Sequence, residues 1–197
     1  MRIISHRGNI NGPDPKLENK WDSIFHAAEM GFDVEFDMWY EHYENNFFLG
    51  HDGPDINQQM ELEQVLELIR YSGHGTRFYI HCKSTETLIA LLNFWPFESD
   101  DPNIQPFFHD IDDCIVVGKS VWVHPKTEFR ALAPYNTLKK NTILVLPRLG
   151  ELQTSWEYSN IQAYAKSKNI EAVCTDYPKM VRTIIDIGNK HDRNTNI

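Results

Sequence analysis

Four short groups of polar residues near the start of the chain have the residue types that acid–base and metal chemistry use. They are His6-Arg7-Gly8, Glu18-Asn19, Glu35-Phe36-Asp37 and His51-Asp52. Histidine changes its charge near neutral pH, so His6 and His51 are candidates for proton transfer. Two neighbouring carboxylates repel unless they share a proton or bind a cation, and hard divalent cations prefer oxygen ligands. The groups therefore predict a metal site with histidines beside it.

The two carboxylates lie in a mostly apolar run, residues 31–39, that has the pattern of a strand. Side chains alternate between the two faces of a strand, so Glu35 and Asp37 point to the same side. Val34, Phe36 and Met38 supply an apolar opposite face. The alternative interpretation is a solvated strand face that binds no metal.

A second pair of polar residues ends another expected strand, residues 77–82. His81 and Lys83 are two positions apart and share a face, whereas Cys82 points away from it. If this face meets Glu35 and Asp37, His81 completes the metal site and Lys83 adds a positive charge beside it. The alternative for His81 is a hydrogen-bonded histidine of the core.

Strand and helix patterns alternate along the whole chain. Strands are expected at 2–5, 34–38, 77–82, 106–108, 121–123, 143–146 and 172–175, with 47–50 as the return arm of a hairpin. Helices are expected at 20–30, 61–71, 85–94, 156–168 and 180–190. This alternation predicts an α/β fold with a parallel sheet. Because a complete eight-stranded barrel typically needs about 250 residues, we expect a trimmed or irregular TIM-type (β/α) barrel, formed by residues 1–197 as a single domain. The expected trimming lies between residues 108 and 123, where there is little room for a helix.

In parallel barrels the working residues lie at the carboxyl ends of the strands. The expected strands of this chain end in polar or aromatic side chains, as at His6, Asp37 and Lys83. Trp122 and His124 end another strand and are candidates for a substrate pocket, where tryptophan offers a large flat surface.

Taken together, these motifs resemble those of the glycerophosphodiester phosphodiesterase family, within the phospholipase C-like phosphodiesterase superfamily. The resemblance covers about the first quarter of the chain and the last strand, where Thr175-Asp176-Tyr177-Pro178 matches, and it is weak in between. It implies that His6 and His51 form the acid–base pair, that Glu35 and Asp37 bind the metal and that Arg7 contacts phosphate. A phospholipase C-like barrel is the implied fold.

The remaining site residues are predicted from their positions and side-chain chemistry. Lys83, Trp122 and His124 are expected to bind substrate or phosphate, and Glu18 is expected to orient a neighbouring site residue. Asp52 is expected to have a structural role as a cap of the turn at Gly53-Pro54, with contact to the metal through water as the alternative. The family has Glu-x-Lys where this chain has His81-Cys82-Lys83. An imidazole ligand should weaken Mg²⁺ and Ca²⁺ and favour softer ions. The implied cofactor is one divalent cation, Mg²⁺, Ca²⁺ or Mn²⁺, with Zn²⁺ possible.

The expected function is metal-dependent hydrolysis of a glycerophosphodiester or a related phospholipid-derived ester. Two alternatives stay open at this point. The chain could be a lyase-type phospholipase that releases a cyclic phosphate, or a catalytically silent module that binds a phosphorylated head group.

Composition bounds the partners. The formal net charge of −9 disfavours nucleic acid, whose phosphates are also negative. Three scattered cysteines, Cys82, Cys114 and Cys174, fit the reducing cytoplasm better than a disulfide framework. The sequence has no apolar run of the roughly 18 residues that a membrane span needs, and its start lacks signal-peptide features. We therefore expect a cytoplasmic protein without stable membrane insertion that binds a small phosphodiester, and the oligomeric state stays open.

Overall fold

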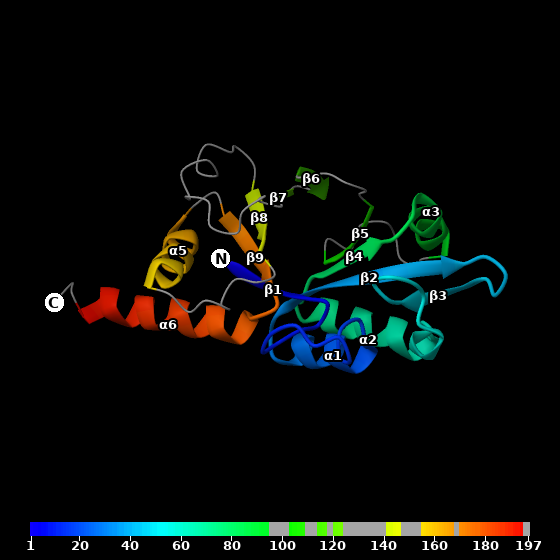
Figure 1. Ribbon diagram of the computed structural model, residues 1–197, viewed down its shortest axis with the longest axis horizontal. Coiled ribbons are helices and arrows are strands. Elements are labelled where there is room, and N and C mark those ends of the chain that lie inside the picture. Colours follow the sequence, from blue (N-terminus) through cyan, green and yellow to red (C-terminus); the bar gives the residue numbers. More distant parts are fainter. Residues whose placement is uncertain are drawn as a thin grey trace. The chain divides into compact units, whose positions relative to one another are not determined.

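The computed structural model describes residues 1–94, 103–108, 114–117, 120–123, 141–146, 155–167 and 170–194. The chain groups into two compact units, whose elements are labelled in Figure 1. Unit 1 comprises Met1–Ile4, Ile10–Pro13 and Asp113–Ile197, and unit 2 comprises Ser5–Asn9 and Asp14–Asp112. Strand β1 (Arg2–His6) therefore begins in unit 1 and ends in unit 2.

Unit 2 contains a parallel arrangement of strands with one antiparallel return. Strand β2 (Asp33–Glu41) pairs in parallel with β4 (Phe78–Cys82), which pairs in parallel with β5 (Ile104–Phe107). Strand β3 (Asn46–Leu49) returns antiparallel along the end of β2. The helices of this unit are α1 (Trp21–Glu29), the short η1 (Ile56–Gln58), α2 (Leu62–Gly73) and α3 (Thr85–Phe94).

The core of unit 2 lies between β2 and the helices α1 and α2, which run side by side (Figure 1). Helix α1 buries Trp21 and Ile24 on one side, as an amphipathic helix does. The Trp21 ring meets Phe36 of β2 edge-on at 5.9 Å between ring centroids. Because Phe36 faces the helices, its neighbours Glu35 and Asp37 point to the other face of β2.

Unit 1 has the same construction. Strands β7 (Ser120–Val123), β8 (Asn141–Val145) and β9 (Ile170–Thr175) pair in parallel, and β6 (Cys114–Val117) pairs antiparallel with β7. Helices α5 (Ser155–Lys166) and α6 (Pro178–Asn194) pack against each other. Leu144 and Val173 of the strands form a buried cluster with Ile161 and Val181 of the helices, and Ile3 of β1 packs on its edge.

The predicted α/β class with parallel strands is confirmed, and parallel strands alternating with helices are the arrangement of a partial TIM-type fold. Every expected strand and helix is present, with bounds that differ by a few residues. Strand β2 extends to Glu41 because β3 supplies hydrogen-bond partners for its end. Strand β6 was not expected; it pairs antiparallel with β7 in the segment where no full helix was predicted. Within the described residues, no helix combines the length and the apolar character that crossing a bilayer requires.

Candidate metal and phosphate site

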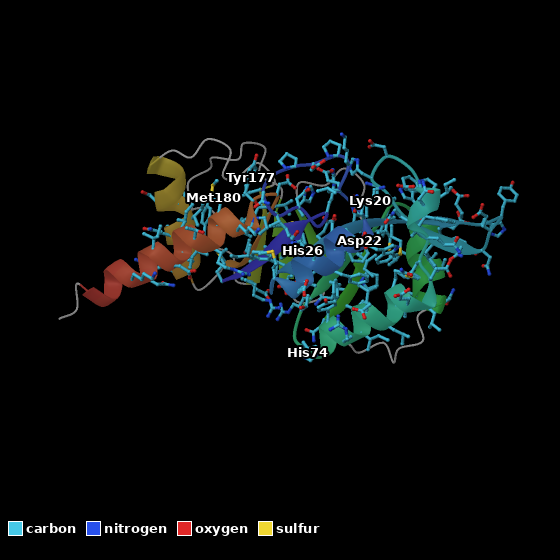
Figure 2. The ribbon with its side chains drawn as sticks, turned by 90° about the horizontal axis from the view of Figure 1, so that it is seen from below. Lys20, Asp22, His26, His74, Tyr177 and Met180 are labelled. Carbon is cyan, nitrogen blue, oxygen red and sulfur yellow. The ribbon has the colours of Figure 1, made fainter. Side chains whose placement is uncertain are left out.

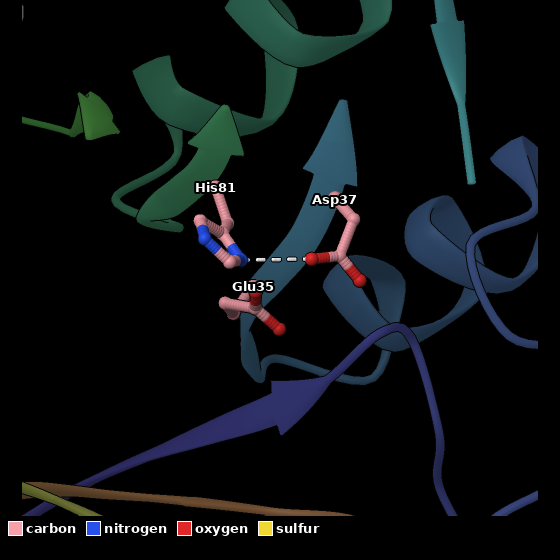
Figure 3. A group of neighbouring side chains, drawn as sticks. All are labelled: Glu35, Asp37 and His81. Carbon is pink, nitrogen blue, oxygen red and sulfur yellow. Dashed lines mark hydrogen bonds and ion pairs between the residues drawn. The ribbon is translucent and has the colours of Figure 1, made fainter. Parts of the chain in front are cut away.

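Neighbouring strands of unit 2 bring Glu35, Asp37 and His81 together. The parallel register of β2 and β4 places Asp37 directly opposite His81, and Glu35 lies two residues earlier on the same face of β2. One ligand atom from each of the three side chains lies within 4.8 Å of the others, and the three point toward one another (Figure 3). The geometry is the one that side-chain alternation predicted, and the chemistry of these donors fits a divalent cation.

Asp37 is the most heavily bonded member of this cluster. Its side chain is 2 % exposed, and its Oδ1 lies 2.8 Å from His81 Nδ1 and 3.4 Å from Lys83 Nζ. Since an ionised carboxylate only accepts hydrogen bonds, His81 Nδ1 carries a proton here. Arg7 Nε lies 3.2 Å from Asp37 Oδ2.

These contacts decide the protonation of Asp37. Burial alone would raise the pKa of its carboxyl, but the hydrogen bond from His81 and the positive charges of Lys83 and Arg7 outweigh burial and lower it. Asp37 is therefore ionised at neutral pH.

Glu35 has the opposite tendency. Burial, and then the negative charge of Asp37, raise the pKa of its carboxyl, although His6, His81 and Arg7 act against this. His6 Nε2 lies 3.9 Å from Glu35 Oε2. Two carboxylates whose pKa values are driven apart can share a proton, and a bound cation would displace that proton because metal ligands must be deprotonated.

Arg7 is held between two carboxylates. Besides Asp37, its guanidinium contacts Glu18, with 3.1 Å between Nη1 and Oε2. The other Glu18 oxygen accepts a hydrogen bond from Asn9 Nδ2 at 3.2 Å. Glu18 therefore holds the Arg7 guanidinium, and the orienting role predicted for Glu18 stays a prediction. The predicted contact between Arg7 and phosphate stays a prediction.

Asn19 is a site residue that was singled out in the sequence only as the neighbour of Glu18. Its backbone is left-handed, with a φ of 52°, a conformation that asparagine tolerates better than most residues. The side chain both donates to Asp37 Oδ2 and accepts from the Asp37 backbone N–H, each at 2.9 Å. The signal for this role was the Glu18-Asn19 motif itself.

Phe107 is a second contributor that sequence reasoning did not place. Its ring stacks on the His81 imidazole, with 5.2 Å between centroids and an interplanar angle of 9°. The pairing of β4 with β5 sets His81 opposite Phe107 and so creates the stack. Together, Phe107 and Asp37 fix the plane and the rotation of the imidazole.

The two histidines of the predicted acid–base pair differ in exposure. The His6 side chain ends β1 and is 16 % exposed, whereas that of His51 follows β3 and is 41 % exposed. His51 Nδ1 lies 2.5 Å from Asp52 Oδ1, and the role predicted for Asp52 stays a prediction. The preceding residue, Gly50, donates its backbone N–H to the Asp37 carbonyl oxygen at 3.3 Å, and the loop that carries His51 thus begins beside the cluster.

That loop has a compact backbone. Gly50 has a φ of 151°, and a Cβ atom there would lie 1.9 Å from the carbonyl oxygen of Gly53, so only glycine fits. The Asp55 backbone N–H then donates to the Leu49 carbonyl oxygen at 2.8 Å. These contacts fold the segment after β3 back on itself.

The same loop is tied to the beginning of α1. Lys20, labelled in Figure 2, forms an ion pair with Asp55. The Trp21 backbone N–H donates to Gln58 Oε1, and its indole N–H donates to the Gln59 carbonyl oxygen, each at 3.0 Å. Three attachments therefore hold the chain that follows His51.

Two predicted substrate contacts belong to the other unit. Trp122 lies in β7 and is 2 % exposed. His124 lies outside the described residues. The substrate-binding roles of both stay predictions.

No protein-family model and no curated protein matches this chain. The functional inference therefore depends on the chemistry of the site. A buried carboxylate pair and an imidazole could hold one cation, while the cationic side chains of Arg7 and Lys83 lie next to them. Such a site can bind a cation and an anion side by side.

Proposed function

We propose that this protein is a metal-dependent phosphodiesterase of phospholipase C-like fold that acts on a glycerophosphodiester or a related phospholipid-derived ester. The observation that carries the proposal is the cluster of Glu35, Asp37 and His81, whose ligand atoms lie within 4.8 Å of one another. His6 beside Glu35 and Lys83 beside Asp37 add a proton-transfer group and a positive charge. Hydrolysis of a phosphodiester benefits from a bound cation, a proton-transfer group and a further positive charge, because the negative charge of the phosphate repels an attacking nucleophile.

Glu35, Asp37 and His81 would hold the cation, which would stabilise the charge that develops on the phosphoryl oxygens. Lys83 supplies a further positive charge for the same oxygens. One histidine of the pair His6 and His51 removes a proton from the attacking hydroxyl group or water, and the other protonates the oxygen of the departing alcohol.

The donor set also supports a choice of metal. Two carboxylates with one imidazole suit Mn²⁺ or Zn²⁺ better than a site made only of oxygen atoms would. His81 would have to turn or lose its Nδ1 proton to ligate through that atom, since Nδ1 now donates to Asp37.

The experiment is hydrolysis of bis(p-nitrophenyl) phosphate by the purified full chain. The protein is stripped with EDTA and then given Mg²⁺, Ca²⁺, Mn²⁺ or Zn²⁺ one at a time. Turnover restored by a cation and abolished in both His6→Ala and His51→Ala supports the proposal. Turnover that survives EDTA, or that survives in both variants, contradicts it. With a glycerophosphodiester as substrate, phosphorus NMR separates hydrolysis from a lyase reaction, which would leave a cyclic phosphate.

One observation favours a second candidate, the silent head-group module. Arg7 and Lys83 both lie within 3.4 Å of Asp37, so two positive side chains line the cluster without a metal and could hold an anion without turnover. Binding of sn-glycerol 3-phosphate that is unaffected by EDTA, with no hydrolysis under any cation, would favour the module.

A further inference from the structure

Trp39 shares the face of β2 that carries the cluster. It lies two residues after Asp37 and four after Glu35, so the alternation of side chains puts all three on one side of the strand. Glu35 and Asp37 are buried, whereas Trp39 is half-buried. Moving toward the carboxyl end of β2, the site face thus passes from buried carboxylates to an accessible aromatic side chain.

Two hydrogen bonds fix where the indole ring lies. Its Nε1 donates to the Gly50 carbonyl oxygen at 2.8 Å, and the Gly50 backbone N–H donates to the Asp37 carbonyl oxygen at 3.3 Å. The indole nitrogen therefore reaches the residue that lies against Asp37. The ring leans back along the strand from position 39 toward the level of Asp37, on the side of its carboxylate.

Gly50 follows β3, which pairs with one edge of β2, whereas Lys83 follows β4, which pairs with the opposite edge. The Lys83 backbone N–H donates to the Met38 carbonyl oxygen at 2.9 Å, so Lys83 extends the pairing of β4 with β2 to the level of position 39. Its ammonium group lies 3.4 Å from Asp37 Oδ1. Positions 39 and 83 therefore lie side by side at the end of the cluster, with the indole reaching Gly50 and the ammonium group reaching Asp37.

We infer that Trp39 contacts the organic group on phosphorus and selects substrates in which this group is planar or apolar. This inference rests on the proposed function, which places the phosphate at the cluster. Two residues of a strand span about 7 Å, so the ring and the Asp37 carboxylate lie within the length of one small organic phosphodiester.

The occupied N–H of the indole sets the type of selectivity. Because Nε1 already donates to Gly50, the ring offers no hydrogen-bond donor to a sugar or glycerol hydroxyl group. What is left is its apolar face, which binds flat or apolar groups. Glycerol would then be the alcohol on the side away from Trp39, and the more apolar alcohol would contact the ring.

Two variants separate contact with the substrate from the structural role of Trp39, which is to hold the His51 loop through its hydrogen bond to Gly50. Trp39→Gln keeps an N–H group that can donate to Gly50 but removes the ring, whereas Trp39→Phe keeps a ring but removes the donor. Tyr43→Leu is the matched control, since Tyr43 is an aromatic residue that is 98 % exposed elsewhere in the same hairpin. Thermal unfolding of each variant verifies that it is folded.

The measurement is calorimetric binding of diphenylphosphinate and dimethylphosphinate to the cation-loaded full chain. Both ligands carry one negative charge, like a phosphodiester, and their carbon–phosphorus bonds resist hydrolysis. The wild type and Tyr43→Leu should bind the diphenyl ligand at least about tenfold more tightly. Trp39→Gln should lose at least about fivefold of that preference without weaker binding of the dimethyl ligand, and Trp39→Phe should keep most of it.

The outcomes also separate this inference from the proposed function. A wild type that binds both ligands equally, or neither, overturns the inference, as does a preference that Trp39→Phe loses and Trp39→Gln keeps. Hydrolysis of a phosphodiester together with any of these results leaves the proposed function standing. A preference for the diphenyl ligand that depends on the Trp39 ring, without hydrolysis under any cation, supports Trp39 as a ligand contact and overturns the proposed phosphodiesterase activity.

Discussion

Asn19 and Asp37 hold each other through two hydrogen bonds of 2.9 Å, one to the Asp37 carboxylate and one from its backbone N–H. The pair is buried, and it connects residues 18 positions apart in the sequence. Asn19 thus holds both the carboxylate and the backbone of Asp37.

Replacing Asn19 should cost stability in two separable ways. Asn19→Ala removes both hydrogen bonds and leaves a Cβ-bearing residue in the left-handed conformation, so we expect a loss of roughly 2–4 kcal/mol in the free energy of unfolding. Asn19→Gly removes the same bonds without the backbone strain and should lose about 1 kcal/mol less. Urea denaturation of both variants measures the difference. Equal losses would mean that the left-handed backbone is not retained.

Glu35→Gln should stabilise the metal-free protein while abolishing metal-dependent turnover. Because folding raises the pKa of Glu35, its contribution to stability is present below the unfolded pKa of about 4.3 and is lost as the pH rises through the folded value. Glutamine is neutral at every pH. The variant should therefore match the wild type near pH 4 and melt roughly 2–4 °C higher at pH 8, which corresponds to about 1 kcal/mol in a chain of this size.

Thermal unfolding in EDTA across this pH range checks the expectation. A variant that melts below the wild type at pH 8 would show that Glu35 is ionised and well compensated in the folded protein. Asp22→Asn, a change in an exposed carboxyl group of α1, controls for the loss of one negative charge.

His6→Ala and His51→Ala should each lower kcat at least about 100-fold, as the loss of a proton-transfer group does. Their effects on stability should differ, because the His51 side chain is 41 % exposed and that of His6 is 16 % exposed. His51→Ala should change the free energy of unfolding by no more than about 0.5 kcal/mol. His26→Ala, at an exposed position of α1, is the control and should leave kcat unchanged (Figure 2).

His81→Asp should change which metal supports turnover. The substitution replaces an imidazole by an oxygen ligand and adds a negative charge, both of which favour hard cations. We expect the ratio of activity with Mg²⁺ to activity with Mn²⁺ to rise by roughly tenfold. An unchanged ratio, measured at saturating metal, would mean that His81 does not ligate the cation.

Cys82 should be inert in the folded protein. Burial raises the pKa of its thiol to about 12, so little reactive thiolate exists near neutral pH. Alkylation by iodoacetamide at pH 8, followed by peptide mass spectrometry, should be at least about 1000-fold slower in the folded chain than in urea. Comparable rates would show that β4 opens readily.

The cluster could be predicted from the sequence because two simple rules determine it. A period of two residues puts Glu35 and Asp37 on one face of their strand, and parallel pairing carries His81 to the same face. The first rule acts over a short stretch that the pattern of Val34, Phe36 and Met38 already marks. The second holds because β4 pairs directly with β2, which the sequence analysis took as a condition. The α/β class followed in the same way from alternating strand and helix patterns.

The contacts that complete the site follow no such local rule. The Phe107 stack depends on which strand pairs with β4, and the Asn19 pair depends on a left-handed turn far from Asp37 in sequence. Strand β6 was not predicted although its residues Cys114–Val117 are as apolar as those of the equally short β7, since the acidic run before it indicated a loop. The sequence pattern places Trp39 only in a strand, because its position beside the site depends on the hydrogen bond from its indole to Gly50.

The segment that follows His51 is attached to α1, and these attachments determine when the segment becomes ordered. With Lys20 on Asp55 and Trp21 on Gln58 and Gln59, the loop becomes ordered as the core of unit 2 forms, before any ligand arrives. This segment then has no ordering left to do when a ligand binds, so no affinity is lost to its immobilisation. If the proposed phosphodiesterase activity is found, its turnover should not be limited by movement of this segment, and a mutation that frees the segment, such as Lys20→Ala, should make turnover more sensitive to solvent viscosity.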